Sequence, residues 1–235
     1  MKTIIHKAQE RGYADHGWLK SYHSFSFASY YDPEKIQFGA LRVLNDDTVA
    51  AGMGFGTHPH QNMEIISIPL SGDLKHHDSM GNEAVIKAGD IQVMSAGSGI
   101  RHSEMNANSD REVKFLQIWI LPNRQQVTPR YDQWTIPQQK MQNRLLQVLS
   151  PNPNDEGVWI YQDAWFHMGQ FDEKLEISYP LKKEGNGVYL FVLEGNISVG
   201  NIQLEQRDGL CISDTTAFDL KADQKSSVLV MEIPI

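Results

Sequence analysis

The sequence has little cysteine and lacks any long apolar run. Cys211 is the single cysteine among 235 residues, so no disulfide can form within the chain. It stands between Leu210 and Ile212, where we expect a buried and unreactive thiol. A membrane-spanning helix needs roughly 20 apolar residues in succession, and no segment reaches that length. The first residues also lack the apolar stretch of a secretory signal peptide. We therefore predict a cytoplasmic protein without a membrane role.

An excess of positive charge is absent as well. The formal net charge is −8; residues 1–145 hold 15 acidic and 15 basic side chains, and residues 146–235 hold 14 and 6. Nucleic acids and anionic membranes are bound by clustered Lys and Arg. We therefore expect neither as a direct partner, and we interpret the acidic second part as a solvated surface.

Helical periodicity is missing from most of the chain. Short segments of alternating or continuous apolar residues end at Gly, Asn, Asp or Pro, and turn signals recur about every 8–12 residues, which is typical of an all-β sandwich or barrel. One short helix is expected within residues 137–149. Expected strands in the best-defined region cover residues 65–70, 74–78, 84–87, 91–94 and 113–121.

Two halves of the sequence share a pattern. A strand, an x-Gly-x turn and a second strand occur around Gly72 and again around Gly195. Residues 122–139 contain three prolines and form an ordered connector in our interpretation, because Tyr131 and Trp134 need burial. We predict two diverged copies of one barrel, with residues 1–139 as the first domain and residues 140–235 as the second.

Two pairs of polar residues at positions i and i+2 stand out in the first half. They are His58 with His60, and His102 with Glu104. Residues i and i+2 of a strand point to the same face, so three imidazoles and one carboxylate can converge. This mixed nitrogen and oxygen set suits one divalent ion of Fe, Cu, Ni, Mn or Zn. The lack of thiolates argues against a structural zinc site.

Other residues near these pairs have less specific signals. His76 and His77 are adjacent and point to opposite faces of a strand, so they are interpreted as structural or surface residues. His16, His23 and His167 are isolated, which also favours structural roles. A dense aromatic group predicts core packing, with the wall of a cavity for a planar ligand as the alternative; it comprises Trp18, Tyr22, Phe25, Phe27, Tyr30 and Tyr31. Met53 and Phe55 precede His58 and are candidates for binding substrate.

The motifs around the histidines resemble those of the cupin superfamily. Gly52, His58, His60 and Glu64 follow the first cupin motif, and Gly89, Gly97, His102 and Asn106 follow the second. Three departures are similar to the pirin family: a longer gap from Glu64 to Gly72, Ser95 in the usual proline position, and four residues between Gly97 and His102. Residues 23–33, 41–47, 56–60 and 94–104 also resemble pirins, in particular the bacterial pirin-like proteins that cleave quercetin.

The resemblance implies a bicupin with two jelly-roll-like barrels and metal in the first barrel alone. The implied ligands are His58, His60, His102 and Glu104, and Glu64 is implied to be a neighbour of the site. The implied function is a metal-dependent dioxygenase that cleaves flavonols such as quercetin with dioxygen and releases carbon monoxide. Glu104 is also a candidate catalytic base, because it is a carboxylate close to a cation.

Two alternatives use the same ligands. One is a non-catalytic, metal- or redox-responsive protein that binds a regulatory protein partner. The other is a related cupin enzyme acting on another phenolic or keto-enol substrate, because one fold supports many reactions. The motifs do not separate these alternatives, and they do not identify the metal.

Overall fold

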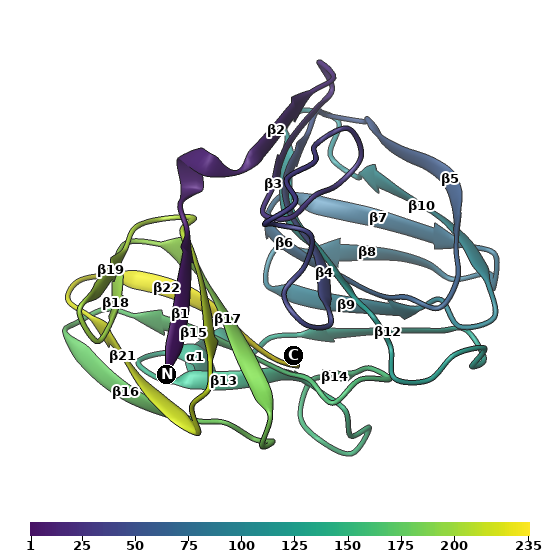
Figure 1. Ribbon diagram of the computed structural model, residues 1–235. Coiled ribbons are helices and arrows are strands. Elements are labelled where there is room, and N and C mark those ends of the chain that lie inside the picture. The colour runs from purple at the N-terminus through teal and green to yellow at the C-terminus, as the bar shows by residue number, and fades with distance from the viewer.

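The computed structural model describes residues 1–235 and consists almost wholly of antiparallel strands arranged in two lobes (Figure 1). Each lobe contains one seven-stranded and one four-stranded sheet. The predicted all-β class and the two similar halves are confirmed. The jelly-roll closure of each half stays a prediction.

The first lobe carries the residues singled out in the sequence. Its seven-stranded sheet comprises, in spatial order, β12 (Arg130–Thr135), β9 (Asp90–Ser95), β6 (Glu64–Ser71), β11 (Val113–Ile120), β4 (Leu41–Val49), β3 (Leu19–His23) and β2 (Gly12–Asp15). Its four-stranded sheet comprises β5 (Gly54–His60), β10 (Ile100–Asn106), β7 (Asp73–Asp78) and β8 (Glu83–Lys87).

The second lobe repeats this division. Its seven-stranded sheet comprises β1 (Lys2–His6), β20 (Gly209–Ser213), β17 (Asn186–Glu194), β22 (Ser226–Pro234), β15 (Trp165–Phe171), β13 (Leu145–Ser150) and β14 (Val158–Trp159). Its four-stranded sheet comprises β16 (Leu175–Pro180), β21 (Ala217–Ala222), β18 (Ile197–Val199) and β19 (Ile202–Leu204). The expected short helix is α1 (Gln138–Met141), and a 3₁₀ turn, η1, covers Ala8–Glu10. Neither helix is long or apolar enough to cross a membrane.

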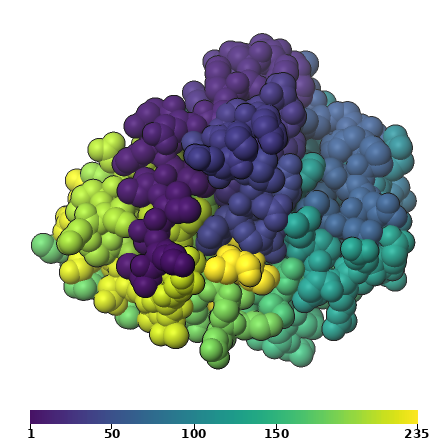
Figure 2. Space-filling view, in the orientation of Figure 1, coloured from purple at the N-terminus to yellow at the C-terminus, as the bar shows by residue number.

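The amino-terminal strand belongs to the lobe formed by the end of the chain. β1 pairs with β20, and the purple segment crosses the surface of the green and yellow lobe in Figure 2. Asp208 fixes the crossing, because its carboxylate accepts hydrogen bonds from the Ala8 amide at 2.8 Å and from Lys7 Nζ at 2.7 Å. The division at residue 139 stays a prediction, and the position of β1 departs from it.

The two seven-stranded sheets contain the longest apolar strands because both faces of these strands are buried. On β6, Ile66 and Ile68 belong to a cluster of 28 buried residues that includes side chains of both lobes. Ile65 and Ser67 alternate with them and face the interior of the first lobe. The seven-stranded sheet of the first lobe therefore has two buried faces. Its outer face forms the core between the lobes, and its inner face points toward the histidines.

The repeated x-Gly-x turns have a shared cause. Gly72 and Gly195 have φ of 73° and 71°, a left-handed conformation that glycine adopts without steric cost. A Cβ atom at Gly195 would lie 2.3 Å from the carbonyl oxygen of Lys225, and one at Gly72 would lie 2.8 Å from that of Glu112. Backbone conformation and close packing thus both require glycine at equivalent turns of the two lobes.

Candidate metal centre

Three histidines from two neighbouring strands meet in the first lobe. β5 and β10 are antiparallel, and His102 lies directly opposite His58 in their register. The candidate ligand nitrogens of His58, His60 and His102 all lie within 4.8 Å of one another. The i and i+2 spacing of His58 and His60 brings both rings to one side of β5, with ring centroids 4.8 Å apart.

The free nitrogens of these rings fit a cation. His60 Nε2 and both ring nitrogens of His102 are buried without a hydrogen-bond partner. Such groups are costly to leave unpaired. His58 Nδ1 lies 2.8 Å from the carbonyl oxygen of Gly56, which requires a proton on Nδ1 and leaves the lone pair on Nε2. One divalent ion would accept the lone pair of each ring, and would so pair His60 Nε2 and one of the two nitrogens of His102.

Burial also keeps the rings in the form that binds metal. It lowers the pKa of His60 to about 4 and that of His102 to about 3, and the neighbouring imidazoles act in the same direction. Both rings are therefore neutral at pH 7, and only a neutral imidazole offers a lone pair to a metal.

Glu104 is held beside this group by two hydrogen bonds. Its Oε1 accepts a hydrogen bond from Ser67 Oγ at 2.8 Å, and its Oε2 accepts one from Gln117 Nε2 at 3.0 Å. The side chain is completely buried, and its charge opposes in small part the lowering of the His60 pKa by burial. The three-histidine cluster does not include Glu104. Its role as a fourth ligand stays a prediction.

Glu64 lies on the other face of the seven-stranded sheet. It alternates with Ser67 along β6 and shares the face of Ile66, toward the second lobe. Its Oε2 accepts a hydrogen bond from Ser95 Oγ at 2.6 Å, and Arg130 donates to that same hydroxyl at 3.3 Å. The expectation that Glu64 neighbours the metal ligands is wrong, because alternation along the strand turns its side chain toward the second lobe.

A cavity of about 520 Å³ adjoins the histidines. His58 and His60 line it together with Phe55, Phe27 and Trp119. Phe27 and Trp119 make an edge-to-face contact with ring centroids 5.5 Å apart. The volume falls within the range of roughly 300–1,000 Å³ that small-molecule sites occupy. Two of the three histidines therefore face a space with aromatic walls.

Comparison with known proteins assigns the family. The family described as Pirin matches residues 5–120, and the family described as Quercetinase C-terminal cupin domain matches residues 147–233. The protein named Quercetin 2,3-dioxygenase from Escherichia coli (strain K12) is 43% identical over 230 residues, which cover 98% of each chain. The chain belongs to the pirin family. Its two halves are therefore pirin cupin domains, and the prediction of an oxidoreductase agrees with the relatives that are named quercetin 2,3-dioxygenase.

Solved structures agree with this assignment. The crystal structure of the bacterial pirin YhhW from Escherichia coli in complex with nickel(II) matches with a TM-score of 0.94 and 41% identity, covering 99% of each chain. A pirin-like protein from Caulobacter vibrioides is 38% identical over 222 residues, covering 94% of this chain and 95% of its own. The histidine group and the nickel complex of the relative together support a bound divalent metal in this pirin.

The structure of this pirin places the two predicted substrate-binding residues differently. Phe55 lines the cavity, and its ring contacts Trp18 with centroids 5.4 Å apart. Met53 is 43% exposed and does not line the cavity. It lies two residues from Phe55 on the chain, but the strand begins at Gly54, so Met53 is outside the regular alternation that directs Phe55 inward.

His76 is a buried neighbour of the pirin site that the sequence interpretation missed. Its Nε2 lies 3.1 Å from Asp78 Oδ2, and its ring centroid lies 5.4 Å from that of His102. His77 is exposed, as expected for the adjacent position. The alternation of Leu74, His76 and Asp78 with charged or exposed residues is the signal that identifies the inward face of β7. His16 and His23 were likewise interpreted as structural, and both line the cavity.

Proposed function

We propose that this pirin is a metal-dependent dioxygenase that cleaves flavonols such as quercetin with dioxygen and releases carbon monoxide. The observation that carries the proposal is that His58 and His60 of the three-histidine group line a cavity of about 520 Å³ with aromatic walls. A flat aromatic substrate fits such walls, because aromatic rings pack favourably edge to face or offset. The names of the relatives support the same reaction.

His58, His60, His102 and Glu104 would hold the divalent ion. A bound ion would supply Lewis acidity, which lowers the pKa of a coordinated hydroxyl and holds the resulting anion. The native metal is proposed to be one of Fe, Cu, Ni, Mn or Zn, because nitrogen and carboxylate ligands accept all of them.

Glu104 is proposed as the base that takes the proton of the flavonol hydroxyl. Its two hydrogen bonds from Ser67 and Gln117 hold the carboxylate in one orientation. Positioning of this kind is what general base catalysis requires before proton transfer. Phe55 and Trp119 line the cavity and would exclude water from the substrate rings.

The test is quercetin consumption in air by the full chain loaded separately with each of the five ions. We expect loss of quercetin absorbance and release of carbon monoxide with at least one ion. The double variant His58→Ala/His60→Ala should show neither. His77→Ala is the matched control, because His77 is an exposed histidine on a strand of the same four-stranded sheet.

A protein that binds metal at this site yet consumes quercetin with no ion would contradict the proposal. The regulatory role with a protein partner, and catalysis on another phenolic or keto-enol substrate, would then become the leading hypotheses. The cytoplasmic location and the division into domains at residue 139 stay predictions.

A further inference from the structure

A row of polar side chains lines the cavity wall that faces the histidine strands. The row comes from β3 and β4, which belong to the seven-stranded sheet, whereas His58 and His60 come from the four-stranded sheet. In the register of these strands, Ser21 lies opposite Asp47 and His23 lies opposite Asn45. All four side chains line the cavity and are at most 3% exposed. The cavity therefore has polar groups on two opposing sides.

Several atoms of this row have no partner within the chain. Asn45 Oδ1 and His23 Nδ1 are buried and form no hydrogen bond, and neither does Trp119 Nε1 in the neighbouring wall. Asn45 is 1% exposed. A buried polar atom is costly to leave unpaired, so each of these atoms calls for a partner from outside the chain. A ligand that offers hydroxyl groups would complete these bonds.

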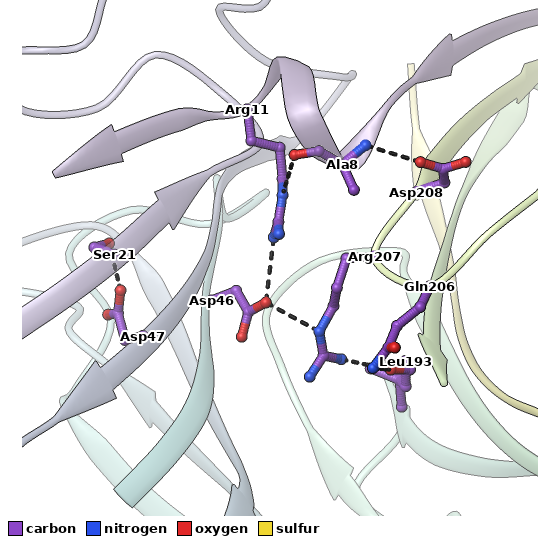
Figure 3. Close-up of polar contacts among 9 residues, drawn as sticks. All are labelled: Ala8, Arg11, Ser21, Asp46, Asp47, Leu193, Gln206, Arg207 and Asp208. Atoms are coloured by element: carbon purple, nitrogen blue, oxygen red, sulfur yellow. Dashed lines mark hydrogen bonds and ion pairs between the residues drawn. The ribbon is translucent and has the colours of Figure 1, made fainter. Parts of the chain in front are cut away.

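Asp47 is the acidic member of the row. The hydroxyl of Ser21 donates a hydrogen bond to its Oδ1 (Figure 3). Burial raises the pKa of Asp47 to about 7, and the charge of Glu104 acts in the same direction. The carboxyl group can therefore meet a ligand hydroxyl as an acceptor or, when protonated, as a donor.

We propose that Asn45 and Asp47 form a second recognition point in the cavity, which binds hydroxyl groups on the rings of the aromatic substrate and selects polyhydroxylated phenols over unsubstituted ones. The proposal rests on the proposed function, since it assigns the metal side of the cavity to the hydroxyl and ketone of the same substrate. The apolar residues that line the same cavity include Leu19, Phe27 and Phe55. They match the flat, apolar body of such a molecule.

The test compares two ligands that share the hydroxyl and ketone pair. Quercetin carries additional ring hydroxyls, and 3-hydroxyflavone carries none. Their dissociation constants are measured by calorimetry on the full chain loaded with Zn(II), which has no redox chemistry of its own. We expect quercetin to bind at least tenfold more tightly than 3-hydroxyflavone.

Substitution of Asn45 should remove part of this preference. Asn45→Leu keeps the branched shape and the number of heavy atoms of the side chain, and Asn45→Ala is a second variant in case the larger Leu disturbs folding. We expect quercetin to bind about three- to tenfold more weakly to either, as for the loss of one neutral hydrogen bond. Binding of 3-hydroxyflavone should change by less than about twofold, because it has no group for Asn45 to meet. Gln92→Leu is the matched control, since Gln92 is a buried amide on the inner face of the same sheet that does not line the cavity.

The outcomes separate this proposal from the proposed function. Equal affinities of the wild-type protein for the two ligands, or equal weakening of both by Asn45→Leu, would overturn the recognition point even if quercetin is consumed in air. Discrimination between the ligands without consumption of quercetin under any ion would refute the dioxygenase and leave the recognition point standing. Failure of both ligands to bind would overturn both.

Discussion

Glu64 and Glu104 are both fully buried, and their carboxylates contact opposite faces of the seven-stranded sheet of the first lobe. Ser67 on the inner face donates a hydrogen bond to Glu104, and Ser95 on the outer face donates one to Glu64. Arg130 contacts the Ser95 hydroxyl and the carbonyl oxygen of Trp159 in the second lobe. One carboxylate thus lies on the face of the sheet that reaches the histidines, and the other lies at the contact between the lobes.

Glu64→Gln should stabilise the protein increasingly as the pH rises. Burial raises the pKa of Glu64 to about 7 from 4.5. Between these values the folded protein retains a proton that the unfolded chain has lost, so the free energy of unfolding of the wild-type protein falls as pH rises. Above about pH 7 the stabilisation that this proton gave is lost in full. Glutamine does not titrate. The free energy of unfolding of the variant, relative to that of the wild-type protein, should therefore rise by on the order of 3 kcal/mol between pH 4.5 and 8. Urea unfolding measures this difference.

An exposed glutamate provides the control for this experiment. The hydrogen bond from Lys75 lowers the pKa of Glu83, so Glu83→Gln should shift the relative stability in the opposite direction and by a small amount. A pH-independent difference between Glu64→Gln and wild type would show that Glu64 has an ordinary pKa in the folded protein.

Ser67→Ala should weaken metal binding without removing any ligand. Its hydroxyl is one of the two hydrogen-bond donors that orient the Glu104 carboxylate. Loss of such a partner typically lowers metal affinity by about 10- to 100-fold. Calorimetric titration with Ni(II) measures the change. Ser103→Ala is the matched control, because Ser103 lies between His102 and Glu104 on β10 and points to the other face. Unchanged affinity in Ser67→Ala would indicate that Glu104 is not a ligand.

Strand alternation explains what could be predicted of the site. A period of two turns His58 and His60 to one side of β5, whereas His102 joins them because β10 pairs with β5 in a register that sets it opposite His58. The apolar runs of β6 and β17 and the two glycine turns likewise follow from local patterns that tertiary packing does not override. Apart from the pairing of β5 with β10, these features depend on residues close in sequence.

The cavity could not be predicted in the same way. Its walls combine β3, β4, β5 and β11 with residues 27–29 from a loop, and no local pattern fixes which segments meet. The inward direction of His23 and Asn45 is readable from alternation alone, but their pairing depends on the register of β3 against β4. Glu64 was expected beside the metal ligands because of its place in the cupin motif, whereas the structure turns Ser67 toward Glu104 and therefore turns Glu64 to the other face.

Loss of His102 should abolish the stabilisation that metal gives. A ligand that binds the folded state alone stabilises it by about 2.7 kcal/mol at a concentration of 100 times Kd. Ni(II) should therefore raise the Tm of the wild-type protein, and the shift should vanish in His102→Gln. His77→Gln should keep the full shift, because His77 is exposed on the neighbouring strand. An equal shift in all three proteins would place the bound metal elsewhere.

Asp46 joins the two lobes through a pair of arginines. Its Oδ2 lies 3.0 Å from Arg207 Nε in the second lobe and 3.2 Å from Arg11 Nη1 in the segment that connects β1 to β2 (Figure 3). The side chains of Arg11 and Arg207 are 7% and 21% exposed, so water solvates the charge of either guanidinium group only in part. Asp46→Asn would leave both cations without their carboxylate at the contact between the lobes.

We expect Asp46→Asn to lower the free energy of unfolding by about 2–4 kcal/mol, near the cost of breaking a buried ion pair. Asp223→Asn removes the partner of Lys174 in a pair whose side chains are 56% and 83% exposed, and it should cost less than about 0.5 kcal/mol. Urea unfolding followed separately by tryptophan fluorescence and by circular dichroism measures both. If the two probes give separate transitions in Asp46→Asn and a single one in wild type, Asp46 couples the unfolding of the lobes. Equal stabilities of Asp46→Asn and Asp223→Asn would instead show that the apolar core between the lobes holds them together without this ion pair.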